Sequence, residues 1–427
     1  MTIESRQEKL FITGLGGLKD ALLPLEKVTL LIGPQASGKS LAAKLLYFCK
    51  SFPREMYLSV LDELTQERFY QRQRLRLSEH FGSAVEAGDF RVCYELQGES
   101  IEIKAAKAKK GRKPKIEIST SEFFTKEYTS LRRVHGKHAR KLEEDDEASV
   151  DLAYRAQFSF YNRITKQFSD RMGAQQIFVP AGRSYFSFLQ GSIFSLLSNN
   201  IPLDPFVKEF GSSYERYKSI ALRPRNNAEE GIRAQVEQIL KGNYRRERGE
   251  DFILTPDGRM VPISSSSSGQ QEVLPLLVML LYFSRGAAIG GRSVYIEEPE
   301  AHLFPDTQKQ LIELLVYVLS RRRSAQVLLT THSPYVCATI NNLILAGDVV
   351  RAAGGVAPSG LKNVTWNAAN LDFDDLSVLS FANGNVRSVL DTESRLIDTR
   401  YLDSISEQII HQREALLDLV PDSSHDA

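Results

Sequence analysis

The stretch VTLLIGPQASGKSLAAKLLYF, residues 28–48, decides the fold of this chain. Its apolar run at 28–32 predicts a buried strand, and its residues 41–46 predict the first turns of a helix. Between them the spacing G-x-x-x-x-G-K-S runs from Gly33 to Ser40. The glycines allow a tight loop whose N–H groups, with the helix N-terminus, converge on phosphate oxygens. The stretch therefore predicts phosphate binding, and the alternative is a glycine-containing turn that binds nothing.

Two side chains of this loop have distinct expected roles. Lys39 would place a point charge on the β and γ phosphates, and the Ser40 hydroxyl would be a ligand of Mg²⁺. The residues expected to bind the nucleotide are Gly33, Gln35, Ala36, Ser37, Gly38, Lys39, Ser40 and Leu41.

Composition limits the class of protein more than its function. The chain has 427 residues, 25% charged, and a formal net charge of +1, so the whole molecule has no bias toward nucleic acid or membranes. The three cysteines, Cys49, Cys93 and Cys337, form no C-x-x-C pair, which argues against a disulfide framework or a zinc site. The N-terminus lacks a signal-peptide layout, and the longest apolar run, 273–283, is too short to span a bilayer. We expect a soluble cytoplasmic protein without a membrane partner.

The segments outside the phosphate loop predict a mixture of strands and helices. Residues 131–150 carry a basic run followed by an acidic run, and we expect them to be exposed and partly disordered. Strands are expected at 10–12, 90–96, 101–104, 115–118, 176–180, 252–254 and 260–262, and helices at 56–87, 151–172 and 186–240.

A basic tip lies between two of these strands. Such a run could bind phosphates, but it has no interleaved aromatic residues, so a solvated hairpin tip is the favoured interpretation over a nucleic-acid contact. The basic residues are Lys104, Lys107, Lys109, Lys110, Arg112, Lys113 and Lys115.

A serine cluster at 264–268 is the start of a second candidate anion-binding site. It is followed by Gly269 to Glu272 and then by an apolar helix that begins near Val273. Hydroxyl groups, backbone N–H groups and the helix dipole there would all favour an anion. A flexible serine-rich linker is the alternative when this stretch is taken alone.

Two further predicted strands end in ionisable residues that could take part in catalysis. The strand at 292–296 leads into Glu297 and Glu298, and the strand at 326–331 leads into His332. In a parallel sheet such positions face the ligand. Glu297 could orient Mg²⁺, Glu298 could polarise an attacking water, and His332 could contact the γ-phosphate or that water. A solvated acidic turn and a structural histidine are the alternatives.

The phosphate loop, the serine-rich helix start, the Glu297–Glu298 strand end and the His332 strand end follow one another in an order that resembles a known family. The chain resembles ATPases of the ATP-binding-cassette class, in the soluble branch with chromosome-maintenance heads, double-strand-break repair heads and overcoming-lysogenisation nucleases. The resemblance covers residues 9–50 and 250–345. Residues 267–271 look like the signature motif, 296–300 like the Walker B strand end, 301–305 like the D-loop and His332 like the switch histidine.

The chain departs from this family pattern at two places. Glu297 stands where the wider class has Asp, as in a variant of the soluble branch. The Q-loop glutamine is unassigned, because Gln175 and Gln176 adjoin a strand whereas Arg183 lies in the loop that follows it.

The resemblance implies an α/β ATPase head with a mixed sheet, a phosphate-loop core, an antiparallel β subdomain and an inserted helical subdomain. We expect the core at 1–55 and 250–350, an inserted hairpin and helical region with the signature-side lobe at 56–249, and a helical C-terminal extension at 351–427. The expected activity is Mg²⁺-dependent ATP hydrolysis.

The resemblance also implies residue roles. Glu298 would be the catalytic base with His332 beside it, and Ser40 and Glu297 would hold Mg²⁺. The signature residues would bind ATP on a second copy in a head-to-tail dimer, as the unit of assemblies up to a hexamer. These residues are Ser267, Ser268, Gly269 and Gln271.

The effector implied by the resemblance lies on another chain. Only 95 residues follow His332 (427 minus 332), so we expect no Toprim nuclease domain here. The acidic residues at 372–374 are better interpreted as a turn than as part of such a domain. Heads of this size resemble ATPase subunits of bacterial anti-phage systems, among them that of the PARIS system. This implies a scaffold that holds a separate Toprim nuclease and releases it when a phage protein is sensed. The alternative is a DNA-binding repair ATPase that uses the basic tip.

Overall fold

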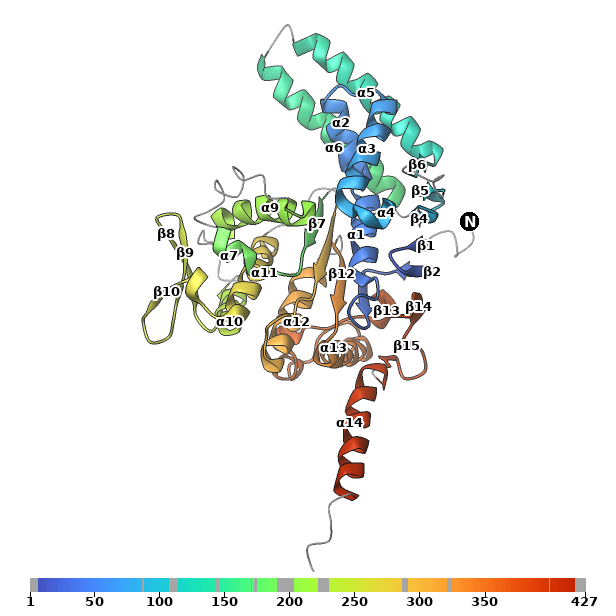
Figure 1. Cartoon of the computed structure of the whole chain (residues 1–427). Coiled ribbons are helices and arrows are strands. Elements are labelled where there is room, and N and C mark those ends of the chain that lie inside the picture. Colours follow the sequence, from blue (N-terminus) through green and yellow to red (C-terminus); the bar gives the residue numbers. More distant parts are fainter. Residues whose placement is uncertain are drawn as a thin grey trace, which may run out of the picture.

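A large mixed β-sheet organises the fold (Figure 1). The computed structural model describes residues 7–86, 88–106, 114–142, 146–169, 171–172, 175–189, 203–221, 230–285, 291–320, 325–398 and 400–418. Within these residues eleven strands form the sheet, in the spatial order β6 (Ile116–Thr120), β5 (Glu99–Ala105), β4 (Phe90–Leu96), β1 (Glu8–Leu15), β2 (Leu18–Leu25), β14 (Asn385–Ser388), β13 (Leu376–Ala382), β3 (Val28–Ile32), β12 (Ala325–Thr331), β11 (Arg292–Glu297) and β7 (Gln175–Val179). The expected α/β class with a mixed sheet is confirmed.

One half of the sheet is parallel. Strands β13, β3, β12, β11 and β7 run in the same direction, so their carboxyl ends share one edge of the sheet. All five residues of β3 are buried, as its continuous apolar run predicts. The strands expected at 28–32, 176–180, 292–296 and 326–331 are therefore confirmed as β3, β7, β11 and β12.

The other half is antiparallel. Strands β4, β5 and β6 pair in the register of the predicted hairpin and third strand, and β1 pairs with both β4 and β2. The sequence did not predict β2, because Pro24 and the adjacent polar pair Lys19 and Asp20 obscure its alternation. A single parallel pair between Asn385 of β14 and Asp20 of β2 joins the two halves.

Two hydrophobic cores cover the two faces of the sheet. Val28, Leu30 and Ile32 of β3 belong to one core, while Leu31 belongs to the other. This division follows from the alternation of side chains along a strand. The first core includes side chains of α11 (Ser268–Ser284), α12 (Pro305–Ser320) and α13 (Pro334–Ala352), and the second includes those of α1 (Lys39–Lys50) and α2 (Phe52–Leu61).

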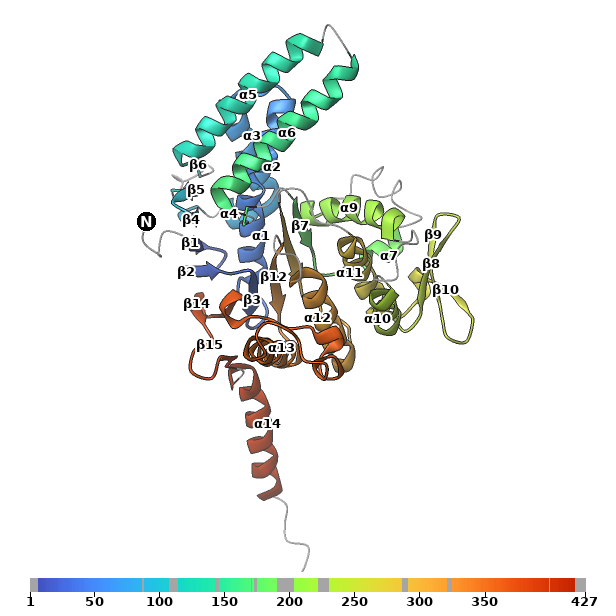
Figure 2. The ribbon, with the colours of Figure 1, turned by 180° about the vertical axis from the view of Figure 1, so that it is seen from behind.

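Helical segments extend from the sheet in three directions (Figures 1 and 2). A helical pair, α5 (Glu122–Leu142) and α6 (Asp146–Phe168), lies beyond α3 (Gln66–Phe81) and α4 (Ser83–Glu86). A lobe beside β7 contains α7 (Tyr185–Leu189), α9 (Pro205–Ala221), α10 (Glu230–Leu240) and a small sheet of β8 (Asn243–Glu247), β9 (Glu250–Leu254) and β10 (Met260–Pro262). The last helix, α14 (Arg400–Asp418), projects away from the body.

Two expectations from the sequence need correction. Residues 131–142 and 146–150 are helical and not disordered, because α5 continues to Leu142 and α6 begins at Asp146. Arg132 and Arg133 are exposed as expected, whereas Leu131 is buried; residues 143–145 lie outside the described part. The C-terminal region is not entirely helical, because β13 is a central strand of the main sheet, and β15 (Leu390–Asp391) pairs with β16 (Leu396–Ile397).

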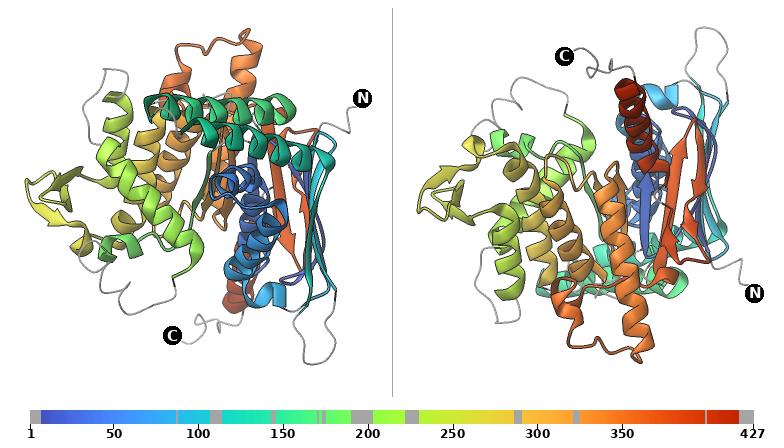
Figure 3. Two further views of the ribbon diagram at one scale, coloured as in Figure 1. Left: turned by 90° about the horizontal axis from the view of Figure 1, so that it is seen from above. Right: turned by 90° about the horizontal axis from the view of Figure 1, so that it is seen from below.

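The views from above and below show the antiparallel strands β1, β2, β4, β5 and β6 along the edge of the molecule that lies opposite the lobe of β8, β9 and β10 (Figure 3). None of the described helices is both long and apolar enough to cross a bilayer.

Candidate functional site

The phosphate-loop residues connect β3 to α1 at the carboxyl edge of the parallel strands. Three of them have positive φ angles: 143° at Gly33, 58° at Ala36 and 101° at Gly38. A Cβ on Gly33 would lie 2.4 Å from the carbonyl oxygen of Phe381, at the end of β13, so a larger residue does not fit. Gly38 caps α1, whose first turn has no acidic side chain. The first turn of α1 therefore adds no negative charge of its own, which favours an anion at this helix N-terminus.

Lys39 points back into this loop. Its ammonium group donates hydrogen bonds to the carbonyl oxygens of Gly33 and Pro34, at 2.8 and 2.7 Å, and lies 3.4 Å from the Ser37 hydroxyl. Burial lowers the pKa of Lys39 to about 8, and the carboxylates of Glu298 and Glu300 oppose this shift. The loop thus holds a cation that titrates near physiological pH.

Glu298 lies at the turn that follows β11. Its φ is +42°, a conformation that a non-glycine residue adopts only when its surroundings hold it there. Its N–H donates to the carbonyl oxygen of Thr330, at 3.0 Å, and to the Thr330 hydroxyl, at 3.2 Å. Its carbonyl oxygen accepts from Arg183 at 2.9 Å. Both backbone polar groups of Glu298 are therefore bound to neighbouring elements.

The structure brings His332 into contact with Glu298. The His332 Nε2 atom lies 3.1 Å from Glu298 Oε1, and both side chains are partly exposed. Glu300 fixes the backbone of His332, because its carboxylate accepts from the His332 N–H at 3.0 Å and from the Thr331 hydroxyl. The ends of β11 and β12 thus carry a hydrogen-bonded Glu–His pair.

Glu297 presents a carboxylate with one occupied oxygen and one free oxygen. The side chain is buried, and its Oε2 atom accepts from the N–H of Ala181 at 3.1 Å. The Oε1 atom is buried and has no hydrogen-bond partner within the described residues. A buried carboxylate oxygen without a donor suits a cation, and Mg²⁺ prefers oxygen ligands. Glu297 therefore fits as a ligand of the expected metal, and Ser40, at the start of α1, has an exposed side chain.

Arg183 is a site residue for which the sequence predicted no role. It lies in the loop after β7, its side chain is fully buried, and its guanidinium group donates to four backbone carbonyl groups. Burial lowers its pKa, and the carboxylate of Glu272 is the largest opposing influence. Only the position of Arg183 in the loop was readable from the sequence, since its partners lie roughly 90 and 115 residues away.

Residues 267–271 form the start of α11, as predicted. Ser267 is the N-cap and makes a capping box with Gln270. The amide group of Gln271 donates to the carbonyl oxygens of Ser264 and Ser266, at 3.1 and 3.0 Å. Ser267 and Ser268 are exposed, and within the described residues no hydrogen bond joins them to the phosphate loop. This stretch is a structured helix start and not a flexible linker.

The turn after Glu300 contacts this helix start. A Cβ on Gly269 would lie 2.8 Å from the carbonyl oxygen of His302, so the two segments approach closely. His302 has a φ of +60°, and the side chain of Phe304 is 76% exposed.

The two candidate glutamines lie away from the site. Gln175 accepts from Arg292 and Gln176 accepts from the Tyr295 hydroxyl, both at 2.8 Å, along β7 and β11. In the loop after β7, the N–H of Ala181 and the side chain of Arg183 reach the end of β11 instead.

The basic tip is only partly described. The side chain of Lys104 pairs with Glu102 at 2.9 Å, and that of Lys115 pairs with Glu117 at 3.0 Å. The other five basic residues, Lys107, Lys109, Lys110, Arg112 and Lys113, lie outside the described residues.

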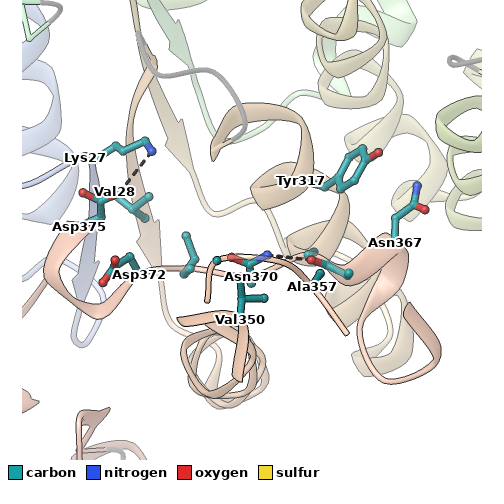
Figure 4. A pocket seen from close by; sticks show the side chains of 13 residues that line it. Lys27, Val28, Tyr317, Val350, Ala357, Asn367, Asn370, Asp372 and Asp375 are labelled. Atoms are coloured by element: carbon teal, nitrogen blue, oxygen red, sulfur yellow. Dashed lines mark hydrogen bonds and ion pairs between the residues drawn. The ribbon is translucent and has the colours of Figure 1, made fainter. Parts of the chain in front are cut away.

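A pocket of about 420 Å³ lies elsewhere, near the amino end of β3 (Figure 4). Lys27, Asp372 and Asp375 line it together with Tyr317 and Asn367, and Lys27 forms an ion pair with Asp375 at 3.3 Å. Asp372 caps a short turn at 373–375, as the interpretation of these acidic residues as a turn predicts. This pocket does not include the phosphate-loop residues.

Comparison with known proteins gives one family match. The AAA ATPase domain family matches residues 8–337, which include the phosphate loop, Glu298 and His332. Among curated proteins the comparison finds no match.

Solved structures that are similar to the chain include two SMC heads and one transporter ATP-binding cassette. The SMC head domain from Thermotoga maritima has 14% identity and a TM-score of 0.35, with 90% of this chain and 98% of that chain covered. An SMC head bound to the C-terminal winged-helix domain of ScpA has 13% identity and a TM-score of 0.41, with 90% and 97% covered. An ATP-binding cassette of an ABC transporter in its ADP conformation has 11% identity and a TM-score of 0.33, with 95% and 98% covered.

Proposed function

The chain belongs to the AAA ATPase domain family and is an ATPase, and from this premise we propose that its active form is a head-to-tail homodimer. The observation that supports this best is the Glu298–His332 pair at the strand ends next to the phosphate loop, combined with an exposed start of α11. In this proposal Ser268 and its neighbours on one copy complete the nucleotide site on the other. Each ATP is then bound between the two subunits and holds them together.

Each site residue has a role in this proposal. The loop N–H groups and Lys39 bind the phosphates, and Glu298 accepts a proton from the attacking water while His332 holds the carboxylate in place. Ser40 and Glu297 hold Mg²⁺, which when bound neutralises phosphate charge. Since Glu298 is held at both of its backbone polar groups, its carboxylate has a defined position before the substrate binds.

Glu298→Gln tests the proposal directly. An amide cannot take a proton, so we expect turnover to fall at least ~100-fold while ATP still binds. The variant is expected to form a stable dimer with ATP, measured by light scattering, whereas Lys39→Ala is expected to lose nucleotide binding. Glu393→Gln, on an exposed turn, is the matched control. Turnover of Glu298→Gln equal to that of the parent protein would refute the role of Glu298.

We further propose that the dimer is the unit of a homo-oligomeric scaffold that controls a separate effector, a Toprim nuclease, in anti-phage defence. The resemblance of the motif series to such ATPase subunits supports this proposal. Co-expression with the neighbouring open reading frame tests it. Copurification and toxicity that depends on a phage protein are expected, and a neighbour that neither binds nor becomes toxic would contradict the scaffold role.

A DNA-repair ATPase is the second candidate. It would use the basic tip, but Lys104 and Lys115 already pair with carboxylates of neighbouring residues. Binding of duplex DNA at several salt concentrations separates the two candidates. Tight binding with a steep salt dependence, abolished when residues 104–115 are neutralised, would favour the repair role.

A further inference from the structure

Arg183 connects three segments that the chain brings together from distant positions. Its Nε atom donates to the carbonyl oxygen of Glu272 on α11 at 3.0 Å. Its Nη1 atom donates to the carbonyl oxygens of Pro180 and Glu297, at 3.1 and 2.7 Å, and its Nη2 atom donates to that of Glu298 at 2.9 Å. A planar guanidinium group can serve several acceptors at once, and a lysine ammonium group in the same place could not reach all of them.

Glu272 fixes the other end of this connection. Its carboxylate accepts from the N–H groups of Arg183 and Ser184, at 2.8 and 3.1 Å, and lies 3.6 Å from the Arg183 Nε atom. Glu272 is buried and lies one helical turn after Ser268. A movement of the α11 start therefore reaches the loop of Arg183 without an intervening flexible segment.

The connection ends on the residue that bears the proposed base. The backbone of Glu298 is bound to Arg183 through its carbonyl oxygen and to Thr330 through its N–H. With its φ of +42°, this residue depends on its neighbours to keep its conformation. A shift of the guanidinium group would therefore change where the Glu298 carboxylate lies relative to His332.

We propose that Arg183 and Glu272 are a positioning pair that couples the α11 start to the Glu298 carboxylate, so that a second copy docking on α11 sets the base for hydrolysis. This inference rests on the proposed head-to-tail dimer. A buried ion pair alone is weak evidence for a role in stability. The specific observation here is that the guanidinium group binds the backbone of Glu297 and Glu298, where position determines chemistry.

The first test separates turnover from binding. In Arg183→Lys we expect kcat to fall by about 10- to 100-fold, because a misplacement of about 1 Å near the chemistry has an effect of this size. The Kd of a fluorescent ATP analogue on the monomer is expected to stay within about threefold, because the phosphate loop is untouched. Glu272→Gln is a milder second variant, which keeps the carbonyl acceptor of the side chain and loses its charge.

Lys50→Gln is the matched control. Lys50 is also a fully buried cation paired with a buried carboxylate, that of Glu8 at 2.7 Å, but it lies at the far end of α1. We expect this control to lower the melting temperature with little change in kcat. If the kcat of Arg183→Lys and Glu272→Gln falls no further than that of the control, the pair is only structural and the inference is overturned.

A double-mutant cycle with Ser268→Ala tests the coupling itself. If Arg183 transmits the position of the α11 start, the kcat losses of Arg183→Lys and Ser268→Ala are non-additive, and the double variant is little worse than the worse single variant. Multiplicative losses would contradict the coupling.

The dimer assay keeps this inference distinct from the proposed function. If Glu298→Gln forms no dimer with ATP, both fail. If it forms a dimer while Arg183→Lys hydrolyses ATP at the parent rate, the coupling alone fails.

Discussion

Lys39 makes ATP binding depend on pH in a predictable direction. Its pKa of about 8 means that the ammonium group loses its proton as the pH rises through 8, and the phosphates then gain no charge partner. Binding above pH 8 therefore requires proton uptake. We expect the Kd for ATP to be nearly constant from pH 6 to 7.5 and to weaken about tenfold between pH 7 and 9, in fluorescence titrations.

Lys39→Arg is the control for this effect, because a guanidinium group stays protonated throughout the range. Its affinity is expected to be lower than that of the parent protein but independent of pH. A parent Kd that does not change up to pH 9 would show that Lys39 keeps its proton.

Gly33 should be more sensitive to substitution than its backbone conformation alone requires. Gly33→Ala adds a Cβ 2.4 Å from the Phe381 carbonyl oxygen, in addition to a strained φ of +143°. We expect the free energy of unfolding to fall by about 3 kcal/mol or more, measured by urea denaturation. Gly17→Ala, with a φ of +86° and nothing within 4 Å, isolates the effect of strain and should cost only about 1 kcal/mol. Equal losses would show that β13 yields to the added methyl group.

At the residue scale, the sequence predicted what local context determines. Glu298 and His332 each follow a readable strand, and they come together because parallel strands place their carboxyl ends at one edge. The roles of Arg183 and Glu272 could not be predicted, because each depends on hydrogen-bond partners that only the folded chain brings close. Thr330 and Glu300, which fix the backbones of Glu298 and His332, were missed for the same reason.

At the element scale, α13 depends on a glycine in its interior. Gly347 has no room for a side chain, since a Cβ would lie 1.9 Å from the carbonyl oxygen of Leu371. The N–H of Leu371 in turn donates to the carbonyl oxygen of Leu343 on the same helix, at 2.9 Å. Gly347→Ala should therefore destabilise the protein by about 2 kcal/mol or more, although alanine normally favours a helix.

Gly136→Ala in α5 is the matched control, because nothing lies within 4 Å of its added Cβ. At this position the higher helix propensity of alanine should raise the free energy of unfolding by about 0.5–1 kcal/mol. If both variants are more stable than the parent protein in thermal unfolding, the close approach at Gly347 is contradicted.

Elements with a local signal were predicted, and those defined by distant partners were not. The β4–β5 hairpin has its turn between its own strands, and α11 has a capping box at its start. By contrast, β13 is a strand because β3 offers it a parallel partner more than 300 residues earlier in the chain. The acidic turn at 373–375 precedes β13, but nothing in the local sequence specifies pairing with β3.

At the scale of the whole molecule, α14 should be dispensable for the stability of the head. It projects from the body, and Ile409, Ile410, Leu416 and Leu417 on it are at least half exposed. Truncation after residue 398 is expected to change the melting temperature by less than about 2 °C and to leave ATP affinity unchanged.

A second truncation, after residue 371, supplies the contrast. It removes β13 and β14 from the sheet, and we expect no cooperative unfolding transition in calorimetry. If the shorter truncation also abolishes the transition, α14 is part of the core of the molecule.

The place of β13 also sets the order of events during synthesis. Strand β3 is made near the start of translation, but its two neighbours, β12 and β13, follow roughly 300 and 350 residues later. At a translation rate of about 5–20 residues per second, β3 has no strand to pair with on either side for tens of seconds. Since the backbone of β13 lies against Gly33, the packing around the phosphate loop is complete only after the ribosome has translated Phe381. We therefore expect a chain that ends before β13 to bind ATP more weakly than the full chain and to be excluded from the proposed dimer.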